Sequence, residues 1–200
     1  MKKYILLFLL MITFFAVGCG NNEPSADDNA QNDESAVFAE LEDLEFCFSS
    51  GAGGWGTTLQ IDKDGNFGGL HTDYNLGETD AEYPKGTCHY CDFSGKFKDV
   101  TKVNEYTYSL KIEKLEFANE LDTSEVKEGV LYEYTTPYGI RDTKEVLLYL
   151  PGAPIAELPE EYVDWIHTSL RNEKETELPF YGIYNPTEKT GFYSYKKIKK

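Results

Sequence analysis

The chain has 200 residues, and 35 acidic against 19 basic side chains give a formal net charge of −16 at pH 7. This length suits one domain of ordinary size rather than two. The acidic excess repels phosphate backbones and anionic headgroups, which argues against nucleic-acid partners and against a charged membrane contact of the folded part.

The first 18 residues have the layout of a secretory signal peptide. Lys2 and Lys3 precede an apolar run at 4–17, which is too short to span a bilayer core of about 30 Å. The run closes on Ala16-Val17-Gly18-Cys19, which resembles the lipobox of bacterial lipoproteins. That resemblance implies that Cys19 becomes the first residue and carries acyl chains such as palmitate. We therefore expect a lipid-anchored protein on the extracytoplasmic side of the cell membrane.

The next segment has the composition of a tether. Residues 20–36 contain no aromatic or large aliphatic side chain, so the segment buries too little apolar surface to offset the entropy of ordering. The expected organisation is a signal peptide at 1–18, a lipidated cysteine with a disordered acidic tether at 19–38, and a single extracytoplasmic β-domain at 39–200.

Alternation of apolar and polar residues predicts strands through the body of the chain. In residues 105–113, tyrosine, leucine and isoleucine alternate with polar side chains, as in a strand with one buried face. Asp64-Gly65 predicts a hairpin turn between two strands. The strands are expected at 46–49, 55–62, 66–70, 89–97, 105–113, 130–135, 146–150, 180–184 and 192–196.

One helix is predicted at 159–170, where Pro159 suits the first position and an apolar stripe follows. Short antiparallel strands with a single short helix predict an all-β fold, either a barrel or a two-sheet sandwich. Trp55, Asp64-Gly65 and Phe67 resemble the opening hairpin of lipocalin-like barrels. The fragments SSGAGGW, DGNF and YLPG resemble those of uncharacterised Gram-positive lipoproteins, a resemblance that implies no activity.

A glycine pattern at the first hairpin imitates a nucleotide site. Gly51, Gly53 and Gly56 match G-x-G-x-x-G, but a dinucleotide site needs a helix that starts at the third glycine. The residues after Gly56 alternate and are β-branched, so we expect a strand there. We interpret the glycines as a connection that lets Trp55 fold over the end of the core, and we expect no nucleotide and no other cofactor.

Three cysteines remain once Cys19 is lipidated. In a strand, Cys88 and Cys91 point to opposite faces, which argues against a redox pair or a metal site. A disulfide between Cys47 and Cys91 and a set of inert thiols are equally compatible with the sequence and with an oxidising compartment. We expect no metal.

No residue pattern in the chain predicts catalysis, because the three histidines lie far apart in sequence and no nucleophile or metalloprotease motif occurs. We expect a non-catalytic binding module for a small ligand or an envelope partner. Loops 51–56 and 71–86 are the expected lining of its site, with Trp55, His71, Tyr74 and Tyr83 as candidate contacts. The alternatives are a structural or assembly role without a ligand, and an envelope hydrolase that gathers carboxylates or a histidine in one cleft.

Overall fold

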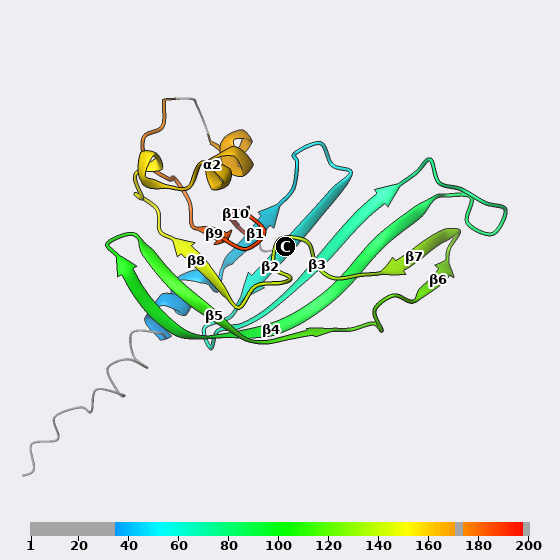
Figure 1. Cartoon of the computed structure of the whole chain (residues 1–200), viewed down its shortest axis with the longest axis horizontal. Coiled ribbons are helices and arrows are strands. Elements are labelled where there is room, and N and C mark those ends of the chain that lie inside the picture. The colour runs from blue at the N-terminus through cyan, green and yellow to red at the C-terminus, as the bar shows by residue number, and fades with distance from the viewer. Residues whose placement is uncertain (1–34, 171–173, 198–200) are drawn as a thin grey trace, which may run out of the picture.

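The computed structural model describes residues 35–170 and 174–197, so the expected signal peptide and Cys19 lie outside the described residues. Within them, ten strands form a single sheet (Figure 1). The strands are β1 (Leu44–Phe48), β2 (Trp55–Ile61), β3 (Asn66–Asn75), β4 (Thr87–Asn104), β5 (Thr107–Phe117), β6 (Ser124–Lys127), β7 (Val130–Tyr134), β8 (Glu145–Tyr149), β9 (Gly182–Asn185) and β10 (Thr190–Lys196). In this part of the chain, no helix has the length and apolar character that crossing a membrane requires.

Eight of the strands close into an antiparallel barrel, so the predicted all-β fold is confirmed as a barrel rather than a sandwich. The order around the ring is β3, β2, β1, β10, β9, β8, β5 and β4. β4 returns to β3 along ten consecutive residue pairs, from Asn66 with Lys96 to Asn75 with Thr87. This pairing closes the ring, and a closed ring leaves no strand edge unpaired.

The predicted turn at Asp64-Gly65 joins β2 to β3. Gly65 has a φ of +78°, a left-handed conformation that glycine adopts without steric cost. The Asp62 carboxylate accepts hydrogen bonds of 2.9 Å from the backbone N–H groups of Asp64 and Asn66. The turn therefore has internal partners for its polar groups and sets the register of the first hairpin.

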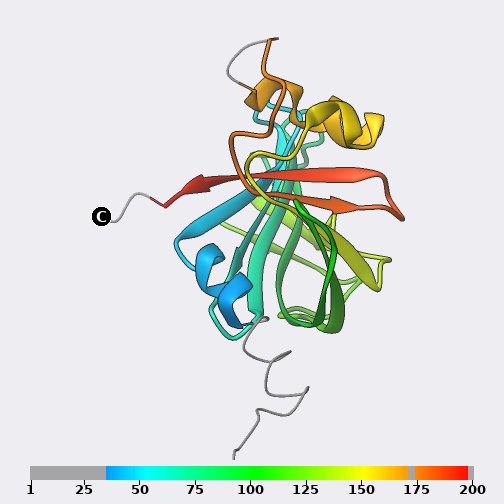
Figure 2. The same cartoon turned by 90° about the vertical axis from the view of Figure 1, so that its left-hand side faces the viewer.

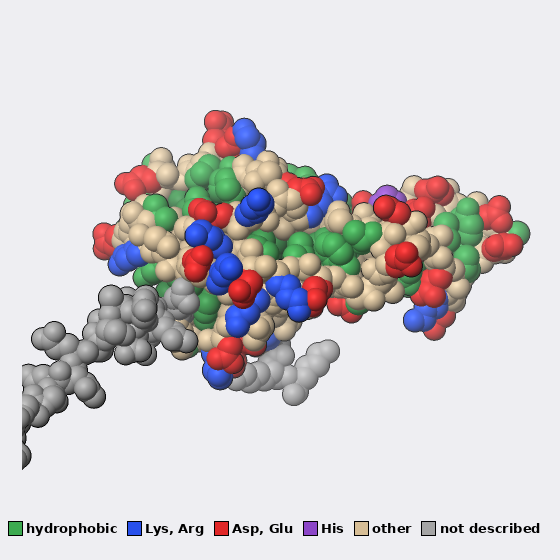
Figure 3. Space-filling model, turned by 60° about the horizontal axis from the view of Figure 1, so that its bottom comes forward, with side chains coloured by type: hydrophobic (Ala, Val, Ile, Leu, Met, Phe, Trp, Pro, Cys, Tyr) green, Lys and Arg blue, Asp and Glu red, His purple; other side chains and the backbone are tan. Residues whose placement is uncertain are grey.

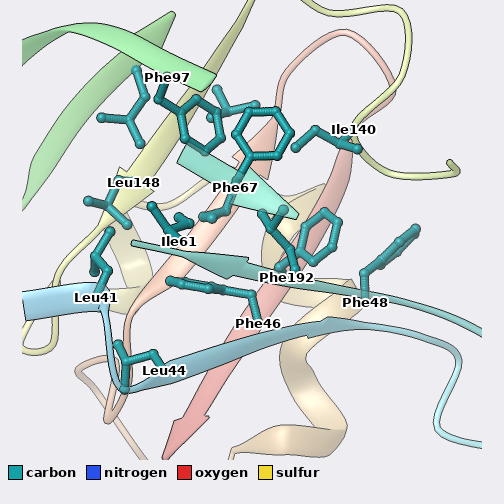
Figure 4. Packing of buried hydrophobic residues seen from close by; sticks show 14 of the residues in the cluster. Leu41, Leu44, Phe46, Phe48, Ile61, Phe67, Phe97, Ile140, Leu148 and Phe192 are labelled. Atoms are coloured by element: carbon teal, nitrogen blue, oxygen red, sulfur yellow. The ribbon is translucent and has the colours of Figure 1, made fainter. Parts of the chain in front are cut away.

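Apolar side chains from every part of the ring fill the barrel interior. In β1, Leu44, Phe46 and Phe48 are buried and alternate with less buried residues. Figure 4 shows aromatic and aliphatic side chains from several strands pointing toward one another across the interior. Members that are 3% exposed or less include Leu59, Ile61, Phe67, Phe93, Phe97, Leu110, Ile140, Val146, Leu148, Ile183 and Phe192. The barrel therefore has a packed core in place of the central cavity that lipocalin-like binding uses.

A helical segment at 35–41 covers one end of the barrel. Phe38 and Leu41 are 3% and 0% exposed and belong to the core. A Cβ on Gly65 would lie 2.7 Å from the Phe38 ring, so the helix packs directly on the β2–β3 turn. The prediction of a disordered tether up to residue 38 is therefore wrong for residues 35–38, because two side chains three positions apart on a helix both reach the core.

β3 and β4 continue beyond the barrel into an extension. The strand predicted at 130–135 is confirmed as β7 in this extension, whereas β6 and the end of β3 beyond residue 70 were not predicted. β4 has 18 residues, and its first part pairs with β3 on one side and in parallel with β7 on the other. β6 completes the sheet beside β7. We call residues 72–75 and 87–90, together with β6 and β7, the arm, which Figure 1 and Figure 3 show reaching away from the barrel.

The predicted helix is shorter than expected. α2 spans Glu160–Ile166 and is followed by a single 3-10 turn at His167–Ser169. Tyr162 is fully buried, and its hydroxyl donates a hydrogen bond of 3.2 Å to the Phe192 carbonyl oxygen. Figure 2 shows the helical segment 35–41 and α2 on opposite sides of the barrel. α2 thus covers the end of the barrel from which β2 begins.

Candidate functional site

A cavity of about 370 Å³ lies where the inner face of the sheet leaves the barrel. We call it the mouth cavity. Its lining comes from the first residue of β2, from β3 and β4, from the segment that follows β7, and from α2. The lining residues are Trp55, His71, Asp73, His89, Thr135, Thr136, Tyr138, Arg141 and Trp165.

The aromatic wall of the mouth cavity is built on one buried ring. Phe48 is 1% exposed, and the rings of Trp55, Tyr138 and Trp165 meet it edge to face at centroid distances of 5.0, 5.0 and 4.8 Å. Edge-to-face packing at these distances is favourable for aromatic pairs. The wall is therefore preformed, and it contains both tryptophans of the chain.

A straight row of side chains crosses four strands on the floor of the mouth cavity and of the arm. Trp55 pairs with Asp73, Asp73 with His89, and His89 with Glu133. Directly paired residues project to the same face, so these four side chains line up across β2, β3, β4 and β7. Three strand spacings give the row a length of about 14 Å. His89 Nε2 and Glu133 Oε2 are 3.0 Å apart.

His71 lies two residues deeper in the barrel than Asp73 of this row and is 5% exposed. Thr57 Oγ1 donates to the Tyr138 carbonyl oxygen at 2.7 Å and lies 2.9 Å from His71 Nδ1. A hydroxyl has one hydrogen, so His71 Nδ1 is the donor in the second bond and Nε2 is left to accept a hydrogen bond. Burial lowers the pKa of His71, Asp73 opposes this effect, and Arg141 adds to it.

The segment that carries Tyr138 and Arg141 is held from below by β9 and the turn after it. Asn185 is buried, and its Nδ2 donates to the Gly139 carbonyl oxygen at 3.1 Å. Arg141 Nε donates to Glu188 Oε1 at 2.9 Å. The Arg141 guanidinium carbon also lies 5.1 Å from the centroid of the Tyr138 ring. These contacts fix the position of the guanidinium and neutralise its charge within the cavity wall.

Two of the four predicted contact residues meet in the mouth cavity, and two lie elsewhere. Trp55 and His71 line it. Tyr74 projects to the outer face of the arm opposite Cys88, where burial raises its pKa to about 12. Tyr83 lies in the connection between β3 and β4 and is half-buried. The predicted loop at 71–86 is also shorter than expected, because β3 continues to Asn75.

Of the two alternatives for the cysteines, the disulfide between Cys47 and Cys91 does not form, and the three cysteines of the described residues are free thiols. In β1, Cys47 lies between the inward-facing Phe46 and Phe48, so it points outward. Cys91 is buried in the core, and burial raises its pKa to about 12. The two sulfurs therefore project from opposite sides of the barrel wall, and Cys91 has the character of an inert thiol.

Seven residues of the mouth cavity were not named as site residues from the sequence: Asp73, His89, Thr135, Thr136, Tyr138, Arg141 and Trp165. Asp73 lies within the predicted loop 71–86, and strand periodicity places it on the same face as His71, so this residue had a usable signal. The other six reach the cavity through contacts distant in sequence. Among residues 35–170 and 174–197, no group of three or more His, Cys, Asp or Glu side chains is arranged to hold a metal ion.

The glycine-rich connection at 51–56 leads into β2 and not into a helix, as the sequence analysis expected. Comparisons with known protein families, with curated proteins and with solved structures find no match. The chemistry of the mouth cavity therefore has to be interpreted from its own residues.

Proposed function

We propose that the protein is a lipid-anchored extracytoplasmic binding module that holds a small ligand, without catalysis, in the mouth cavity. One observation carries this proposal: the barrel interior is filled, whereas the mouth has a cavity of about 370 Å³ that combines an aromatic wall with hydrogen-bonding groups. Ligand sites typically combine apolar walls with a few fixed polar groups.

The rigidity of the cavity wall supports this proposal. Phe48 fixes three rings, and Thr57 fixes the orientation of His71. A wall that is already ordered loses little conformational entropy when a ligand binds. The cavity is therefore suited to binding without rearrangement.

The position of the described N-terminal segment agrees with a tether. Phe38 packs on Gly65, at the end of β2, whereas Trp55 begins the same strand at the mouth cavity. Seven strand residues separate the two ends by about 20 Å. A tether from Cys19 would thus leave the mouth cavity facing away from the membrane, where ligands arrive from outside.

Binding can be tested with the intrinsic fluorescence of the protein, because both tryptophans line the cavity. A library of small molecules and envelope fragments is expected to contain a ligand that changes the emission saturably and raises the melting temperature. Asp73→Ala should weaken this ligand. Asp92→Ala, an exposed aspartate elsewhere on β4, should not. A library without any saturable ligand contradicts the proposal.

The lipid anchor has its own test. Cells grown with radiolabelled palmitate should label the wild-type protein and Cys47→Ala, but not Cys19→Ala, and globomycin should block maturation. Labelling of the Cys19→Ala protein would show that the lipid is elsewhere or that the processing differs.

The filled interior also favours a second function, a structural or assembly role in the envelope without a ligand. This role predicts a stable partner protein together with an empty ligand screen. Chemical cross-linking in intact cells, followed by mass spectrometry, distinguishes it from ligand binding.

A hydrolase is a third candidate, since the cavity brings Asp73, His71 and His89 together. The hydrogen-bond directions weigh against a nucleophile–base pair of Thr57 and His71, because the Thr57 hydroxyl hydrogen points to a carbonyl oxygen and not to the imidazole. Release of product from envelope substrates by the wild type, lost in Asp73→Ala, would favour hydrolysis over binding alone.

A further inference from the structure

The charged groups around the mouth cavity almost cancel one another. Arg141 is paired with Glu188 at 2.9 Å, and Glu188 has only 12% of its side chain exposed. His89 lies 3.0 Å from Glu133, and His71 is buried. One lining charge lacks such a partner: among the described residues, no hydrogen bond or ion pair engages the Asp73 carboxylate. Apart from Asp73, the charged groups of the described lining are therefore balanced within the cavity wall.

The polar groups that line the cavity include both acceptors and donors. Asp73 contributes two carboxylate oxygens. The Arg141 guanidinium has five N–H groups, of which Nε donates to Glu188 and Nη1 to Thr136 Oγ1. Thr135 and Thr136 add hydroxyl groups. A ligand that both donates and accepts hydrogen bonds, as hydroxyl groups do, matches this lining.

One aromatic face of the cavity is not available to a cationic ligand. The Arg141 guanidinium lies over the Tyr138 ring at 5.1 Å, so it occupies the face that would otherwise attract a cation. An anionic ligand is disfavoured by the Asp73 carboxylate and by the formal charge of −16. A neutral ligand with several hydroxyl groups avoids this repulsion and does not need the Tyr138 face.

The shape of the site matches such a ligand. Trp55 ends a row that continues through Asp73 and His89 to Glu133, with a length of about 14 Å across the strands. Sugar rings have an apolar C–H face that packs on an indole and an edge of hydroxyls that donate to carboxylates. A chain of about three sugar rings matches this length.

We propose that the ligand of the mouth cavity is a neutral saccharide, bound with a ring against the tryptophan wall and hydroxyl groups on Asp73. This inference rests on the proposed function, since it names the ligand class of the same cavity. Trp55 and Trp165 would report the stacking directly, and Asp73 would carry the hydroxyl recognition.

The experiment is a fluorescence titration of the full chain in a detergent that has no sugar headgroup. The probes are maltotriose, cellotriose, xylotriose and triacetylchitotriose, with choline and benzoate as the cationic and anionic comparisons. At least one trisaccharide should change the tryptophan emission saturably and bind tighter than either ion. Asp73→Asn should weaken that saccharide roughly 10-fold or more, because hydrogen bonds to a charged group are strong. Asp92→Asn should leave its affinity within about twofold, because its carboxylate lies outside the cavity.

Two results would overturn the saccharide assignment. One is that no trisaccharide binds, and the other is that binding is indifferent to Asp73→Asn while the melting temperature of that variant is unchanged. If choline or benzoate binds instead and depends on Asp73, the ligand class is wrong but the mouth cavity remains a binding site. If the saccharides, the ions and the wider library are all silent, the proposed function fails as well.

Discussion

Replacing Phe48 by alanine should destabilise the barrel and collapse the wall of the mouth cavity together. The ring is 1% exposed and contacts four other aromatic rings at centroid distances between 4.8 and 5.4 Å. Loss of the buried apolar surface costs about 2 kcal/mol. A residual cavity approaching 100 Å³ adds about 2 kcal/mol at roughly 24 cal/mol per Å³. The expected loss in the free energy of unfolding is therefore about 4 kcal/mol.

Urea unfolding measures this loss, with tryptophan emission and far-UV circular dichroism as independent probes. Phe48→Leu is the matched control, since it keeps most of the volume and should cost only about 1 kcal/mol. Trp55 and Trp165 both touch the Phe48 ring, so their emission in the folded alanine variant should also shift to the red. A loss below about 1.5 kcal/mol for Phe48→Ala would refute the packing described here.

Three further predictions concern the residues that shape the site. Burial lowers the pKa of His71 below its usual 6.5, so below pH 6.5 the unfolded chain binds a proton at this residue that the folded protein does not bind. The melting temperature should therefore fall as the pH drops below 6.5, and His71→Gln should flatten that fall. An equally steep fall in His71→Gln would contradict this role of the imidazole. Asn185→Ala should cost roughly 2 kcal/mol in urea unfolding, because the carbonyl oxygens of Gly139 and Arg141 each lose a hydrogen bond from the buried amide. An unchanged midpoint would contradict the role of Asn185 under the cavity. Gly69→Ala should prevent folding or lower the melting temperature sharply, because the added Cβ would lie 2.1 Å from the Thr58 carbonyl oxygen. Gly68→Ala is the control, since its Cβ would lie 3.6 Å from the nearest atom, the Phe93 carbonyl oxygen. Similar melting temperatures for the two variants would exclude this steric explanation.

Strand periodicity predicted most strands of the ring because they have one buried face and one more exposed face, as β1 and β4 do. The tight turn at Gly65 was equally readable, since aspartate and glycine favour its conformation. Periodicity failed where a segment has no burial contrast: the four residues of β6 are all exposed, and no strand was predicted there. The strand predicted at 130–135 is confirmed as β7, although its five residues are all half-buried. The arm was therefore only partly readable from the sequence.

The site was only partly predictable for a different reason. Trp55 and His71 belong to one hairpin, so their proximity follows from local pairing. Tyr138 and Arg141 reach the same cavity because Asn185 and Glu188 hold their segment from more than 40 residues further along the chain. Contacts of this kind depend on the completed barrel, and no local pattern encodes them.

Closure of the ring concentrates the risk of self-association in one short strand. In the described part of the sheet, β6 (Ser124–Lys127) is the terminal strand, and its outer backbone groups face solvent. Only four residues long and carrying both Glu125 and Lys127, it is a poor template for fibril growth. A surface crowded with many copies of this protein would thus be protected from edge-to-edge polymerisation by the charges and the brevity of a single strand.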